Sequence, residues 1–170
     1  MVKTSRVTDR RKLQFSSMPD ILDDVEYLAS GDPPRTTGNW SGGQIVQHVA
    51  MLLNFSIDGF PAPRLALPMR ILGRLVRKRA LVNPIRAGIR FPRKWTFLAP
   101  DGAIIWEDAV EYMNESMARL GTERMTAPSP ILGKLSPEQW EQLHCRHAEM
   151  HFSFMREAPP LEGGEGLRNL

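Results

Sequence analysis

The stretch of residues 135–157, LSPEQWEQLHCRHAEMHFSFMRE, constrains the fold more than any other part of this chain. Its start combines Ser136 as an N-cap, Pro137 at the first helical position and Gln139 as the partner in a capping box. The apolar residues that follow recur at the spacing of one helix face. The stretch therefore predicts an amphipathic helix that packs one face against other helices.

Three of the four histidines lie within this predicted helix, and they share its apolar face. At about 100° per residue, His144, His147 and His151 lie within about 60° of one another. Cys145 and Glu149 point nearly the opposite way, so Cys145 is expected to be a small buried or boundary residue and Glu149 is not expected to reach the histidines.

His147 and His151 are four residues apart, so their imidazoles can reach one metal ion. A third ligand with good geometry must come from another helix, and His48 is the only other histidine. It lies on the apolar stripe of its own predicted helix. The pattern alone leaves two readings open: a metal site made by His48, His147 and His151, or core histidines that hydrogen-bond within the protein.

The remaining chain predicts an all-α domain. Four more helices follow from apolar spacing, caps and breakers, at residues 19–29, 41–58, 68–79 and 104–120. No strand is predicted. We interpret residues 1–170 as a single domain with three less regular parts: a loose basic lead-in (1–16), a long crossover (61–100) that carries the accessory helix, and a flexible tail (159–170).

Charge is concentrated in the crossover. Residues 61–100 carry 10 basic and no acidic side chains, whereas residues 101–170 carry 6 basic and 12 acidic ones. Arg70, Arg74 and Arg77 lie together on the accessory helix and form a candidate anion-binding face. Alternatives are contact with a membrane surface, and a solvated face that pairs with the acidic last third of the chain. Nucleic-acid binding is disfavoured because no nucleic-acid motif accompanies the charges.

Several classes of protein are excluded by composition. No apolar run approaches the about 20 residues that span a bilayer. The charged N-terminus lacks the apolar core of a secretory signal. A single cysteine, Cys145, excludes an internal disulfide framework and fits a reducing compartment. We therefore expect a cytoplasmic location.

Two sequence stretches resemble a known superfamily. GNWSGGQIVQHVAMLLNFSIDGFP and LGKLSPEQWEQLHCRHAEMHFSFM are similar to the DinB/YfiT-like metal-binding proteins, closest to a branch known only as a domain of unknown function. The match rests on Trp40 and Ser41 before a helix that carries His48, and on a closing helix that carries His147 and His151.

This resemblance implies an up-down-down-up four-helix bundle with a long connection between its second and third helices. It implies a three-histidine site for nickel, zinc or a similar divalent ion, open to water or a small-molecule substrate, and no organic cofactor. His144 then lies beside the ligands without binding the ion, and Gln44 is placed to orient a ligand or a water. The implied activity is that of a thiol-type transferase or a hydrolase, with no catalytic base assigned. The alternative is a non-catalytic bundle that is stabilised by metal, binds a surface or forms a homodimer.

Overall fold

The computed structural model describes residues 1–61, 67–89 and 95–158. Within these ranges the chain is mostly helical, as predicted. The α-helices are α1 (Met18–Ala29), α2 (Gly42–Asp58), α3 (Leu67–Val82), α4 (Trp106–Ala118) and α5 (Pro137–Phe152). The tail predicted for residues 159–170 lies outside the described residues.

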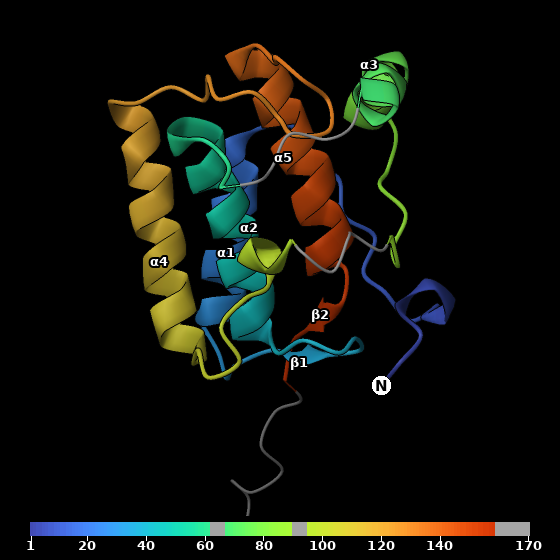
Figure 1. The fold of residues 1–170 in the computed structure, drawn as a ribbon. Helices are drawn as coiled ribbons and strands as arrows, with labels where there is room; N and C mark the ends of the chain where they lie inside the picture. The colour runs from blue at the N-terminus through green and yellow to red at the C-terminus, as the bar shows by residue number, and fades with distance from the viewer. Residues whose placement is uncertain (62–66, 90–94, 159–170) are drawn as a thin grey trace, which may run out of the picture.

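Helices α1, α2, α4 and α5 surround the apolar core (Figure 1). Helix α2 packs against both α4 and α5, and α1 packs against the same two helices. Ile21, Val46, Leu53, Met113 and Trp140 are fully buried between them. Helix α3 stands apart from this group and contacts α5. It belongs to the stretch that was predicted to cross the domain.

Local signals set the starts of α2 and α5 as the sequence predicts. The Ser41 side chain accepts from the backbone N–H of Gln44, and the Gln44 side chain accepts from the N–H of Ser41. Ser136 and Gln139 form the same reciprocal pair at the start of α5. Helix α2 ends at Gly59, whose φ of +98° is a conformation that glycine adopts without strain.

The C-terminal end of the last helix differs from the prediction. Helix α5 ends at Phe152, five residues before the predicted end at residue 157. Strand β2 (Met155–Arg156) then pairs antiparallel with β1 (Arg35–Thr36), so the described chain is not purely helical. Residues 155 and 156 therefore form a strand in place of the predicted last turn of the helix. Strands this short have no alternating apolar pattern in the sequence that would predict them.

The lead-in is also more ordered than predicted. The backbone N–H of Arg11 donates to the Ser153 carbonyl at 2.9 Å, and its guanidinium pairs with Asp24 at 2.6 Å. Phe15 is buried, and its N–H donates to the Glu149 carboxylate at 2.6 Å. The second half of residues 1–16 therefore covers one side of α5, and the prediction of a loose segment is wrong there.

Candidate metal centre

The structure brings together three of the four histidines. His48 extends from α2, and His147 and His151 extend from α5. One ring nitrogen from each lies within 4.8 Å of the other two. The ring centroids are 5.1 Å apart for His48 and His147, 4.6 Å for His48 and His151, and 4.5 Å for His147 and His151. We call these three residues the histidine triad.

A backbone carbonyl orients the His48 ring. Nδ1 of His48 lies 2.7 Å from the carbonyl oxygen of Leu98, in the short 3-10 helix Thr96–Leu98. Because a carbonyl only accepts, Nδ1 carries the proton and Nε2 keeps its lone pair. Metal-binding histidines are commonly held by such a bond on their other nitrogen. This contact could not be predicted from the residue types, since any residue can supply a carbonyl.

Trp40 forms one wall of the triad. Its ring stacks on His151 at 5.6 Å with an interplanar angle of 11°, and it lies 4.9 Å from the His48 ring. Trp40 immediately precedes Ser41, so the start of α2 also positions this indole. His48 is buried, whereas His147 and His151 are each partly exposed. One side of the triad is therefore covered by an aromatic ring, and its two α5 residues keep part of their surface exposed.

The electrostatics of the triad favour neutral imidazoles. Burial lowers the pKa of His48, and the bond to Leu98 opposes this only in part. Burial and then the charges of the neighbouring histidines hold the pKa of His147 well below 6.5. Burial, His48 and Arg10 do the same for the pKa of His151. All three rings are thus neutral near pH 7, the form that binds a metal ion.

His144 lies outside the triad. It stacks on Trp140 at 5.4 Å, and its Nε2 lies 3.1 Å from the Ser56 hydroxyl. That hydroxyl donates to the Leu53 carbonyl, so Nε2–H of His144 must be the donor to Ser56. Its Nδ1 is buried without a hydrogen-bond partner. His144 is therefore a neutral core histidine, and burial lowers its pKa to about 3.

The expected role of Gln44 is not the one its side chain plays. Its Oε1 accepts from Ser41, and its Nε2 makes a long, 3.4 Å bond to the Asp101 carbonyl. Both ends of the amide are thus used at the start of α2. The Leu98 carbonyl takes the place of Gln44 as the group that orients a triad histidine.

Carboxylates are kept away from the triad. Glu149 is buried on the far side of α5, where it accepts from Phe15 and pairs with Arg146 at 2.7 Å. This agrees with the predicted direction of its side chain. Over residues 1–61, 67–89 and 95–158, no carboxylate hydrogen-bonds to His48, His147 or His151. The described site thus offers nitrogen ligands without an attached acid or base.

Two arginines of the candidate anion-binding face on α3 contact the loop beneath the helix. Arg77 donates to the Lys134 carbonyl at 3.1 Å. Arg74 lies beside Gly133 of the same loop. The side chain of Arg70 lies outside the described residues. Arg77 is therefore engaged in attaching α3 to the body of the protein.

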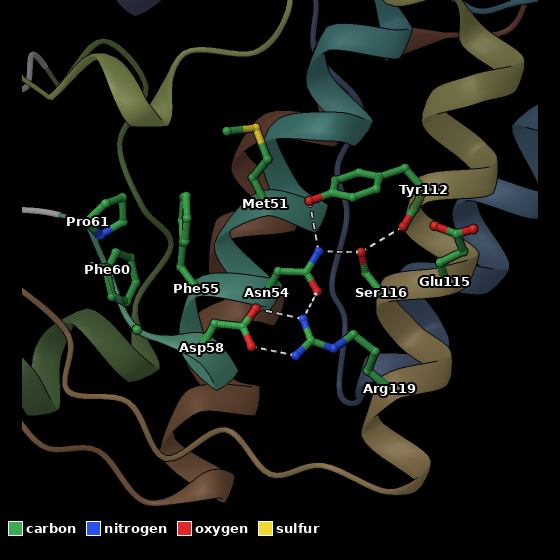
Figure 2. A pocket seen from close by; sticks show the side chains of 11 residues that line it. Met51, Asn54, Phe55, Asp58, Phe60, Pro61, Tyr112, Glu115, Ser116 and Arg119 are labelled. Carbon is green, nitrogen blue, oxygen red and sulfur yellow. Dashed lines mark hydrogen bonds and ion pairs between the residues drawn. The ribbon is translucent and has the colours of Figure 1, made fainter.

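A pocket of about 750 Å³ opens between α2 and α4 (Figure 2). Asn54 bonds to Tyr112 at 2.9 Å and to Ser116 at 2.8 Å on its floor. Arg119 pairs with Asp58 at 2.6 Å and also with Glu123, which hold the pKa of the guanidinium above its ordinary value. Arg119 is the one cationic side chain among the described residues that line this pocket, and two carboxylates already pair with it. The triad histidines do not line it.

No helix in the described parts of the chain is long and apolar enough to cross a membrane. Searches of curated proteins and of solved structures gave no match. Residues 7–158 match the family described as "Protein of unknown function (DUF1569)", and this match includes all three triad histidines. The chain therefore belongs to the DUF1569 family.

Proposed function

We propose that this protein binds one divalent metal ion, nickel or zinc, through His48, His147 and His151. The observation that carries the proposal is the convergence of three imidazole nitrogens, from two helices, to within 4.8 Å of one another. Ligand nitrogens at about 2.1 Å from a zinc ion lie about 3.0–3.4 Å apart, so the rings must close by at most about 1.8 Å. Small rotations of imidazole rings cover that distance.

The surroundings of the triad support the same proposal. Neutral rings, a buried His48 held by Leu98, and the buried Nδ1 of His147 without a partner are what a ligand set for a cation requires. Three histidines with a further open position are a known arrangement for catalytic zinc. Partial exposure of His147 and His151 leaves room for such an opening.

We also propose that the fold is of the DinB type. The pairwise packing of α1, α2, α4 and α5 supports an up-down-down-up four-helix bundle. Helix α3 and the described parts of residues 61–100 then form the long connection between the second and third bundle helices. The order of the motifs around His48 and His147 supports membership of the DinB/YfiT-like superfamily.

The reaction class that fits such a site is a transferase acting with a thiol, or a hydrolase, on a small molecule. A divalent ion with an open position lowers the pKa of a bound water or thiol. The chain itself orients His48 through Leu98 and shields His151 with Trp40. Since no carboxylate hydrogen-bonds to the triad in the described structure, a protein carboxylate is not part of this proposal.

The metal content of protein purified without a histidine tag tests the ligand set. Wild type loaded with nickel or zinc and then desalted is expected to hold one ion per chain. His147→Gln is expected to hold far less. His144→Gln is the matched control on the same helix and keeps the ion, because His144 bonds to Ser56 outside the triad. Circular dichroism checks that each variant is folded.

The proposal fails if loaded wild type holds no stoichiometric metal, or if His144→Gln loses as much as His147→Gln. A second measurement separates an open site from a closed structural one. Cobalt-substituted protein is titrated with 2-mercaptoethanol, and a thiolate-to-cobalt absorption band is expected if a coordination position is open. A spectrum that does not change contradicts the transferase and hydrolase proposals and leaves a metal-stabilised bundle.

A further inference from the structure

Helix α3 exposes an apolar stripe along its outer face. At about 100° per residue, Leu67, Ile71, Leu75 and Val82 lie within about 80° of one another, on the side opposite Gly73. Their exposed fractions are 64%, 50%, 76% and 71%. Leu72, Val76 and Met69 are also exposed, at 51%, 41% and 52%, and lie farther round the helix. Isolated exposed apolar residues are normal, but several on one helix indicate an interaction surface. We call the first four residues, Leu67, Ile71, Leu75 and Val82, the α3 stripe.

The attachment of α3 fixes which face points outward. Gly73 packs so closely on the loop beneath it that a Cβ would lie 1.9 Å from the carbonyl oxygen of Ile131. Leu81 is buried, and Arg77 donates to the Lys134 carbonyl. Gly73 lies opposite the stripe, whereas Arg77 and Leu81 lie on the side next to its Leu67 edge, about 80° and about 40° from that residue. Figure 1 shows α3 at the edge of the molecule, beside α5 and away from α4. The α3 stripe is therefore held away from the core.

Positive charge borders the stripe on both sides. By the same helical geometry, Arg74 lies about 20° outside the Leu67 edge and Arg79 about 40° outside the Leu75 edge, while Lys78 lies within the stripe. Helix α3 carries five basic residues and no acidic one. Among the described side chains, ion pairs involve Arg11, Arg119, Arg146 and Arg156, and none involves α3. The basic residues of α3 are thus not neutralised by the acidic last third of the chain in the described structure.

We propose that α3 binds an anionic lipid surface, with its axis in the membrane plane. An interfacial helix needs apolar residues to enter the acyl boundary and flanking Lys or Arg residues to reach the headgroups. The α3 stripe supplies the first, and Lys78 and Arg79 supply the second. A second copy of the chain fits this face poorly, because an isologous contact would bring two sets of five positive charges together.

Vesicle co-sedimentation of the full chain tests the proposal. Wild type is expected to bind vesicles of phosphatidylcholine mixed with phosphatidylglycerol and to bind phosphatidylcholine alone much more weakly. Leu75→Gln is expected to weaken binding about tenfold, since it removes the most exposed apolar side chain of the stripe. Lys78→Gln with Arg79→Gln is expected to weaken binding about 25-fold, at about fivefold for each charge.

Ile105→Gln is the matched control, because Ile105 is 56% exposed at the start of α4, outside the stripe. It is expected to bind vesicles as wild type does, and thermal unfolding confirms that all variants fold. Equal binding to neutral and anionic vesicles, no binding to either, or unchanged binding by Leu75→Gln overturns the proposal. A second overturning result is a protein that does not bind vesicles but forms a dimer in sedimentation equilibrium, where Leu75→Gln abolishes the dimer. The stripe would then be a protein interface. None of these vesicle measurements requires metal-loaded protein, so failure of the lipid-binding proposal is separate from failure of the metal-site proposal.

Discussion

His144 makes folding sensitive to acid, and its surroundings define the effect. The ring is 1% exposed, stacked on Trp140, and donates from Nε2 to Ser56. Protonation would place a second N–H, on Nδ1, where no described group accepts it. Burial therefore lowers the pKa of His144 from 6.5 to about 3. In the unfolded chain the same ring titrates near its ordinary pKa.

The difference between the pKa of His144 in the folded and unfolded states sets the sign and size of its effect on stability. Because the unfolded state binds a proton that the folded state refuses, the free energy of unfolding falls as the pH drops below about 6.5. One pKa unit corresponds to about 1.36 kcal/mol, so about 1.5 units between the unfolded pKa and pH 5 cost about 2 kcal/mol. The full contribution of His144 is present above pH 6.5 and is lost as the pH falls toward 3.

Urea unfolding of wild type and His144→Gln, with a chelator in both samples, isolates this contribution. Glutamine can still donate to Ser56 but has no titrating ring. At about pH 8 wild type is expected to be more stable by about 1–3 kcal/mol, the usual cost of a core change. At about pH 5 that gap is expected to shrink by about 2 kcal/mol. Carboxylates titrate alike in both proteins and cancel. A gap that stays constant between the two pH values refutes the burial argument.

Three further changes test the fold and the triad. Gly73→Ala is expected to lower the free energy of unfolding by about 1–3 kcal/mol and to raise hydrogen exchange in α3, because its Cβ would lie 1.9 Å from the carbonyl oxygen of Ile131. Unchanged exchange would contradict the close packing. Ser136→Ala removes the cap of α5 and is expected to lower the free energy of unfolding by about 1 kcal/mol in urea; an unchanged midpoint would show that the cap adds nothing. Trp40→Leu is expected to weaken zinc binding about tenfold in calorimetry without changing the stoichiometry, because the stack on His151 is lost; unchanged affinity would mean that the stack does not position the ring.

Local signals in the sequence were sufficient to predict most helices and to select His48, His147 and His151 as candidate metal ligands. The capping pairs at Ser41 and Ser136 involve residues three apart, so their chemistry is visible without knowledge of the fold. The triad was predicted by a different argument: an i, i+4 pair needs a third ligand from another helix, and His48 is the only histidine on another helix. The structure brings His48, His147 and His151 together, which is the part of that prediction it can test.

Contacts made by the backbone could not be predicted in this way. The Leu98 carbonyl at His48, the β1–β2 pairing and the docking of Gly73 on Ile131 all depend on main-chain groups that every residue carries. Helix α3 shows the same difficulty, since an apolar stripe on a helix is normally assigned to the core. The exposed fractions of its apolar residues and the approach of Gly73 to its loop show that the outer face of α3 is exposed.

The two sides of α5 explain why the triad can be held in place without a bound ligand. On one side, Trp40 and His48 pack against the histidine face. On the other, Glu149 is fixed by the Phe15 N–H and by Arg146, so the helix cannot rotate without breaking buried charged contacts. Sites carried on rigid elements keep their geometry better than sites on loops. The ordered lead-in is therefore part of what positions His147 and His151, although no residue type in it indicated this role in the sequence.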